Sequence, residues 1–181
     1  HAWRIFQRDF SKVFGRNVHL GALQQAQLRI VYAPAAHTLA PEAFCLRFFP
    51  TENGPVMELQ GADDLGLIYG LLHLSEHYLG VDPFWFWCGQ EPDVRSAVAI
   101  PCREYHSPPR RVRYRGWFVN DEVCLIGWSD TYPPAASTWL PVFETLLRCG
   151  GNLVIPGTDL PRHGVHWQLA SDMGLYITHH H

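Results

Sequence analysis

The alternation of short apolar strands with helices in the last part of the chain constrains its fold most. Apolar runs at 113–120, 152–155 and 175–178 predict strands, and amphipathic stretches at 138–149 and 163–173 predict the helices between them. Such alternation is typical of a parallel sheet, because each helix returns the chain to the end of the sheet at which the previous strand began. We therefore predict the first three strands of an incomplete (β/α)8 TIM barrel, in which the residues at the strand C-terminal ends carry the chemistry.

The preceding residues predict a small N-terminal α/β domain, with two helices packed on one sheet. Strands are expected at 27–33, 44–49, 56–60 and 97–100, and helices at 3–14 and 64–79. Gly66 and Gly70 lie on one face of the second helix. Each glycine costs up to ~1 kcal/mol of helix propensity relative to alanine. A close approach of this helix to the sheet would offset that cost.

A proline-bearing polar stretch separates the two patterns. The Pro108-Pro109 pair in this stretch cannot lie inside a helix or a central strand. We therefore expect the N-terminal α/β domain at 1–107 and the start of the catalytic barrel at 108–181.

Composition and charge exclude several classes of protein. The net charge is −3 and there is no run of Lys or Arg, so the basic surface of a nucleic-acid binder is absent from the sequence. No apolar run approaches the ~18 residues of a membrane-spanning helix. We therefore expect neither a nucleic acid nor a membrane as a partner.

The five cysteines are scattered and form no C-x-x-C pair, which argues against a disulfide framework or a structural zinc site. Free thiols favour a reducing compartment such as the cytoplasm. A secreted or periplasmic location stays open, because the chain begins at His1 rather than Met and a leader could be missing.

The first predicted barrel strand leads directly into Asn120, Asp121 and Glu122. Glycosidases use two carboxylates that flank the scissile bond, so Asp121 and Glu122 are our candidate catalytic residues and Asn120 a candidate substrate ligand. Neighbours on an extended strand point to opposite faces, so these two carboxylates are not expected to form the complete pair. The alternative is that one of them caps the following loop or helix.

Three further groups of residues are candidates for substrate binding. His179, His180 and His181 follow the third predicted strand. They are interpreted as a native strand end, as part of a purification tag, or as a metal cluster. The last reading is disfavoured because neighbours on a strand would not converge on one ion. No metal and no cofactor are expected.

The second group is the aromatic block around Trp85 and Trp87, which either packs at a domain interface or offers a stacking platform to a sugar. The third is Asp159 with His163 and His166, after the second strand. This segment either touches the substrate, or is solvated and caps the next helix.

Several segments together resemble glycoside hydrolase family 115, the xylan α-glucuronidases. They are residues 61–89 (GADDLGLIYGLLHLSEHYLGVDPFWFWCG), 114–122 (YRGWFVNDE), 127–128 (GW), 142–152 (VFETLLRCGGN) and 174–180 (GLYITHH). The resemblance implies an N-terminal domain like the one that precedes the barrel in family 20 β-hexosaminidases. It also implies removal of 4-O-methyl-glucuronic acid from xylan by an inverting route. Asn120, Asp121, Glu122, His179 and His180 would lie in the pocket, with Arg115 near the strand base in a structural role.

This sequence departs from the family pattern in two places. The family has an aromatic segment after its second strand, where this chain reads Ile-Pro-Gly-Thr-Asp at 155–159, and Phe84 and Phe86 stand where Trp is common. Specificity for a related uronic acid or a neutral sugar therefore stays open.

A barrel of this kind needs about 200–250 residues, which exceeds the length of residues 108–181. The general acid would then lie on later strands, so we predict that this polypeptide alone is inactive. Two alternatives remain: a non-catalytic carbohydrate-binding module that uses Trp85, Trp87 and Trp117, or a metal-dependent barrel enzyme that uses the terminal histidines. A homodimer stays open as the assembly state of the full-length enzyme.

Overall fold

A computed structural model describes residues 1–21, 27–32, 39–158, 160–161 and 163–180. The chain divides into two compact units, an N-terminal unit (Ala2–Arg111) and a C-terminal unit (Val112–His181). Each is described by itself. Within the described residues, no helix has the length and apolar character that crossing a membrane requires.

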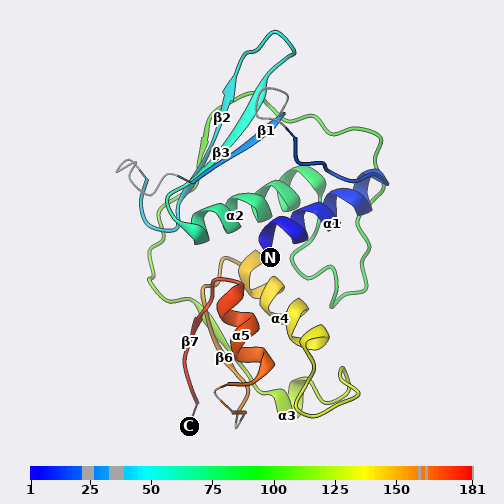
Figure 1. Cartoon of the computed structure of the whole chain (residues 1–181), viewed down its shortest axis with the longest axis vertical. Helices are drawn as coiled ribbons and strands as arrows, with labels where there is room; N and C mark the ends of the chain where they lie inside the picture. The colour runs from blue at the N-terminus through cyan, green and yellow to red at the C-terminus, as the bar shows by residue number, and fades with distance from the viewer. Residues whose placement is uncertain (22–26, 33–38, 159, 162, 181) are drawn as a thin grey trace. The chain divides into compact units, whose positions relative to one another are not determined.

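The N-terminal unit is a four-stranded sheet with its helices on one side (Figure 1). Its elements are α1 (Ala2–Phe14), β1 (Leu28–Tyr32), β2 (Phe44–Phe49), β3 (Val56–Gly61), α2 (Asp64–Leu74), the π-helical turn η2 (Ser75–Leu79) and β4 (Tyr105–His106). The strand order is β1-β3-β2-β4; β1 is parallel to β3, and the other two pairings are antiparallel. The five longer elements predicted at 3–14, 27–33, 44–49, 56–60 and 64–79 are present, the last as α2 continued by η2.

Two glycines bring α2 close to the sheet. A Cβ on Gly66 would lie 2.3 Å from the backbone oxygen of Ala43, and one on Gly70 would lie 2.3 Å from Cδ1 of the buried Leu59. These distances are far below ordinary contact, so neither position tolerates a side chain without movement. The predicted close approach of this helix to the sheet is therefore confirmed.

A buried polar contact joins α1 to the end of the second helix. Asp9 is fully buried, forms an ion pair with Arg8 at 2.7 Å and accepts a short hydrogen bond from the hydroxyl of Ser75. Gly15 follows α1 with a positive φ of 64°, as expected of a C-terminal cap.

The strand predicted at 97–100 is wrong. Residues 97–100 pair with no strand, and the short strand β4 instead occupies the edge beside β2, where Tyr105 pairs with Leu46. The apolar run misled the prediction, because Ala97, Val98 and Ile100 line a cavity rather than pair with a neighbouring strand.

The C-terminal unit alternates strands with helices. Its elements are β5 (Gly116–Val119), α3 (Asp121–Cys124), α4 (Ala136–Arg148), β6 (Leu153–Pro156), α5 (Val165–Asp172) and β7 (Tyr176–Ile177). The sheet order is β5-β6-β7 and both pairings are parallel. The predicted strand–helix alternation is confirmed, although the first strand is shorter than the 113–120 expected. A closed barrel requires more strands than these three, so the barrel stays a prediction.

The two faces of this sheet differ. Val119 and Val154 are buried on the face over which α4 and α5 lie (Figure 1). On the other face, Phe118 and Tyr176 are 43% and 51% exposed, and their strand neighbours Leu153 and Ile155 are partly exposed. The apolar residues of this second face have no covering layer within the described residues.

Candidate active site

A side chain at the end of β5 caps the helix that follows. Oδ1 of Asn120 accepts a hydrogen bond from the backbone N–H of Val123 at 3.1 Å, which starts the four-residue helix α3. Asp121 and Glu122 are therefore the first two residues of a helix rather than part of an extended strand. The sequence left open that a carboxylate forms the cap, and the structure gives this role to Asn120.

The two carboxylates lie in contrasting environments. Asp121 is fully buried, and its Oδ1 accepts a hydrogen bond from the backbone N–H of Thr158 at 2.9 Å. Glu122 is exposed to solvent. Adjacent carboxylates with different surroundings can take different roles, one held in place and the other free to meet a ligand.

A glycine permits the contact of Asp121 with the loop after β6. Gly157 has a φ of 90°, and a Cβ there would lie 3.1 Å from Oδ1 of Asp121 and 2.6 Å from Cδ1 of Leu160. A side chain at this position would therefore be strained and would press on the carboxylate. Asp159 lies outside the described residues, so its predicted contact with substrate stays a prediction.

The rings of His179 and His180 contact different elements. The ring of His180 stacks on Phe118 of the open sheet face, with centroids 4.6 Å apart and an interplanar angle of 11°. The ring of His179 instead lies 5.9 Å from that of Trp167 on α5. His181 lies outside the described residues. No group of three potential metal ligands occurs within the residues that the structure describes.

His166 is a buried titratable group next to this site. It is 1% exposed, and its ring centroid lies 5.6 Å from that of Trp139 on α4. Burial lowers the pKa of His166; the charge of Asp121 opposes this effect, and His179 adds to it. His166 falls within the helix predicted at 163–173 and lies in the first turn of α5, but the sequence pattern did not indicate its burial.

Arg115 joins the base of β5 to its surroundings. Its guanidinium donates to the carbonyl oxygens of Gly150 at 2.7 Å and of Val112 at 2.6 Å. Asn152 is fully buried, accepts from the backbone N–H of Arg115 at 2.8 Å and donates to the carbonyl of Arg113 at 2.7 Å. These contacts fit the structural role expected of Arg115.

Trp85 and Trp87 belong to the N-terminal unit. The cationic groups of Arg8 and Lys12 lie 4.8 Å and 4.9 Å from the ring centroid of Trp85, within the range of cation–π attraction. Phe86 contacts both tryptophans edge to face, at 5.9 Å and 5.1 Å. The predicted stacking on sugars therefore competes with intramolecular partners at Trp85.

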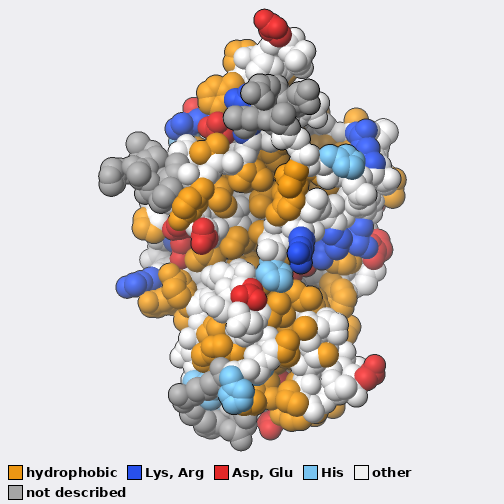
Figure 2. All heavy atoms as spheres, in the orientation of Figure 1, with side chains coloured by type: hydrophobic (Ala, Val, Ile, Leu, Met, Phe, Trp, Pro, Cys, Tyr) orange, Lys and Arg blue, Asp and Glu red, His pale blue; other side chains and the backbone are white. Residues whose placement is uncertain are grey.

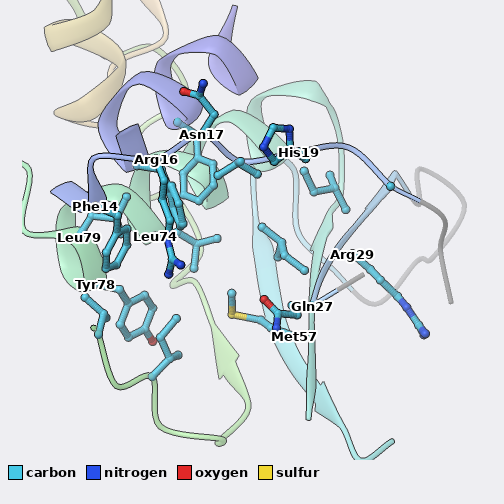
Figure 3. A pocket seen from close by; sticks show the side chains of 18 of the residues that line it. Phe14, Arg16, Asn17, His19, Gln27, Arg29, Met57, Leu74, Tyr78 and Leu79 are labelled. Carbon is cyan, nitrogen blue, oxygen red and sulfur yellow. The ribbon is translucent and has the colours of Figure 1, made fainter. Parts of the chain in front are cut away.

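The N-terminal unit also contains a cavity of about 1150 Å³ between α1, the sheet and the segment 96–102 (Figure 3). Its walls are mainly apolar, with Phe6, Phe10 and Phe14 contributed by α1, and Figure 3 shows the Arg16 side chain lying beside Phe14 and Leu74. Hydrophobic side chains also reach the surface of this unit (Figure 2). No Asp or Glu is among the described residues that line the cavity, so it lacks the carboxylates of a glycosidase site.

The carboxylates at the end of β5 lie on a parallel β/α unit, and the sequence of this unit is similar to a known family. Residues 107–181 match the model of glycosyl hydrolase family 115. The resemblance to this family is therefore confirmed, and the C-terminal unit carries its sequence pattern. A comparison with curated protein sequences gave no significant match.

The solved structure of a family 115 4-O-methyl-α-glucuronidase with specificity for decorated arabinogalactans is similar to this chain. The two share 25% sequence identity with a TM-score of 0.79 over 97% of this chain. The chain spans about a quarter of the relative's length, since the match covers 26% of that protein.

Proposed function

We propose that the site at the end of β5 belongs to a glycoside hydrolase that removes glucuronic acid or 4-O-methyl-glucuronic acid side groups from a polysaccharide. The observation that carries this proposal is the contrast between the fully buried Asp121 and the exposed Glu122 on adjacent residues of α3. This contrast occurs inside the segment that matches the family model. Carboxyl groups are the catalytic groups of most glycoside hydrolases.

We assign one side of an inverting mechanism to this site. An inverting pair of carboxyl groups stands roughly 6.5–9.5 Å apart, so that water and the sugar fit between them. Asp121 and Glu122 are consecutive residues of one short helix, and Asp121 is fully buried. They therefore contribute to one half of the pair, and its partner carboxyl comes from another segment.

Neighbouring groups suit a sugar acid. The amide nitrogen of Asn120 and the ring nitrogens of His180 can donate hydrogen bonds to hydroxyl or carboxylate oxygens. The 43% exposed ring of Phe118, stacked on His180, offers an apolar surface to the carbon face of a pyranose.

This site is proposed to bind the uronic acid side group rather than the main chain of the polysaccharide. Family resemblance suggests xylan as the polymer, whereas the similar solved enzyme is specific for decorated arabinogalactans. Both are polymers that a glucuronidase can debranch, so we propose a glucuronic acid branch as the recognised group. Experiment has to decide between the two main chains.

We further propose that the 181-residue chain does not hydrolyse these substrates by itself. The described residues of α3 supply two adjacent carboxylates, and hydrolysis requires a second carboxyl group across the scissile bond. Release of free uronic acid from aldouronic xylo-oligosaccharides or glucuronidated arabinogalactan by this chain would contradict this proposal.

The test of the site is binding by the chain itself. We expect 4-O-methyl-glucuronic acid to shift the backbone amide NMR signals of residues 118–122 and 180, and xylose, which lacks the carboxylate, to leave them unchanged. Glu122→Gln should weaken this response because it alters the exposed carboxyl group. Glu91→Gln changes an exposed glutamate of the N-terminal unit and serves as the matched control.

Equal responses to both sugars would overturn the proposal of uronic acid recognition. Binding that is lost in Trp85→Ala but unchanged in Asp121→Ala and Glu122→Gln would instead support a carbohydrate-binding module. Stoichiometric zinc in untagged protein would support the metal-dependent alternative.

A further inference from the structure

Buried polar atoms without hydrogen bonds are concentrated beneath the candidate active site. Within the described residues there are five such side-chain atoms, and one of them, Nε of Arg29, lies in the N-terminal unit. The other four are Oδ2 of Asp121, Nε1 of Trp139, Oγ1 of Thr158 and Nδ1 of His166. An unsatisfied buried group costs about 1–3 kcal/mol, so their concentration in one place calls for an explanation.

The four residues form one connected cluster. The backbone N–H of Thr158 bonds Oδ1 of Asp121, the charge of Asp121 acts on His166, and the ring of His166 lies 5.6 Å from that of Trp139. They come from four different segments, namely α3, α4, α5 and the loop after β6. The cluster therefore ties the strand-end site to the two helices that cover the sheet.

The ring of His166 is held on two sides. A Cβ on Gly164 would lie 2.4 Å from Cε1 and 2.6 Å from Nδ1 of His166, so the backbone of Gly164 packs directly against this edge of the ring. Trp139, which is fully buried, limits the ring from α4. A buried ring in such a place keeps a fixed orientation.

The chemistry of the four atoms is complementary. An indole N–H only donates, a carboxylate oxygen only accepts, and a neutral imidazole nitrogen does either, depending on its tautomer. Oδ2 of Asp121 is the one obligate acceptor of the cluster. Nδ1 of His166 is the one nitrogen that becomes a donor or an acceptor by moving a proton within its own ring.

We propose that His166 is a positioning residue for Asp121, with its Nδ1–H donating to an ordered water that in turn donates to Oδ2 of the carboxylate. The proposal rests on the function proposed for the α3 site, because it assigns His166 the task of orienting that site's buried carboxylate. With Oδ1 fixed by Thr158 and Oδ2 by His166 through this water, both oxygens of Asp121 are held. The first turn of α3, which carries Asn120 and Glu122, then keeps one orientation.

The charged and titratable groups around His166 determine the signature to be measured. Asp121 on α3 favours the protonated ring, and His179 after β7 disfavours it. The contact from α4 is the uncharged Trp139. Removal of the Asp121 charge should therefore lower the pKa of His166 further, and removal of His179 should raise it.

The test uses the 181-residue chain and needs no activity. Nitrogen-15 NMR of the imidazole rings should show the proton of neutral His166 on Nδ1. In Asp121→Asn, we expect this proton to move to Nε2 and the titration midpoint of His166 to fall. His179→Gln should raise that midpoint. His180→Gln removes the neighbouring histidine that stacks on Phe118, and serves as the matched control that leaves both quantities unchanged.

A second pair of variants separates positioning from packing. Asparagine at 166 places its amide nitrogen near the position of Nδ1, so His166→Asn should preserve the slow amide exchange of Thr158. His166→Leu fills a similar volume without a donor and should accelerate that exchange.

The proposal is overturned if neutral His166 carries its proton on Nε2, or if Asp121→Asn leaves both its tautomer and its titration unchanged. Equal exchange of the Thr158 amide in the two position-166 variants would also contradict it. None of these measurements involves a sugar, so failure of this proposal and failure of the proposed function are distinguishable.

Discussion

Substitution of Gly66 by alanine tests whether the close contact of α2 with the sheet holds the N-terminal unit together. The new Cβ would lie 2.3 Å from the backbone oxygen of Ala43, which also accepts a hydrogen bond from the backbone N–H of Ala62 at 2.9 Å. This segment is further fixed by the N–H of Glu42, which donates to Asp63 at 2.8 Å. The clash is therefore with anchored backbone, which cannot yield in the way a side chain does.

The expected loss follows from three contributions. Overpacking costs about 1–3 kcal/mol, loss of the Ala62–Ala43 hydrogen bond costs about 1 kcal/mol, and the gain in helix propensity returns about 1 kcal/mol. We expect Gly66→Ala to lower the free energy of unfolding by about 2 kcal/mol. For a chain of this size, that corresponds to a melting temperature lower by about 4–8 °C.

Urea unfolding followed by amide NMR signals of the N-terminal unit measures this change. Gly70→Ala should cost less, because its Cβ meets the side chain of Leu59 rather than backbone. Gly21→Ala is the matched control, because no atom lies within 4 Å of its Cβ and its φ is not positive. Stability equal to the control in Gly66→Ala would refute the inference that backbone contact makes glycine necessary at this position.

Two further predictions concern ionisable groups. Burial, with a smaller contribution from His77, lowers the pKa of His73 to about 4, so its stabilising contribution is complete above the ordinary pKa of 6.5 and is lost as the pH falls from 6.5 to about 4. Urea unfolding at several pH values should show this loss, and His73→Phe should reduce it; an unchanged pH profile would contradict the assignment. Glu144→Gln should cost about 3 kcal/mol because it removes the negative charge from a buried ion pair with Arg148 at 2.9 Å. Glu91→Gln, at an exposed ion pair, should cost at most about 1 kcal/mol, and equal losses would show that burial is not the cause.

Local patterns in the sequence predict much of the fold. The apolar run at 44–49 coincides with β2, and the spacing of Gly66 and Gly70 indicates the helix–sheet contact, because both signals depend on neighbouring residues. The segment 97–100 fails for the opposite reason. Its apolar run fits a strand, but β4 occupies the sheet edge beside β2, and no local pattern indicates which of the two segments pairs there.

The candidate site is predictable in position but not in detail. The strand end is the basis for proposing residues 120–122, but the pattern does not reveal that the chain turns into a helix at Asp121 with Asn120 as its cap. Nor does sequence spacing separate His179 from His180, whose partners lie on α5 and β5. The sequence names His166 only as a residue that touches substrate or lies near a helix cap, because its burial against Trp139 depends on three-dimensional packing.

The uncovered face of the β5-β6-β7 sheet has a consequence for how this polypeptide behaves in solution. Phe118 and Tyr176 stand exposed on that face, and the outer edges of β5 and β7 have no neighbouring strand within the described residues. An exposed apolar sheet face with unpaired edge strands is a template for strand addition by another chain. The chain should therefore self-associate as its concentration rises, and a polypeptide that covers this face or pairs with these edges should suppress the association.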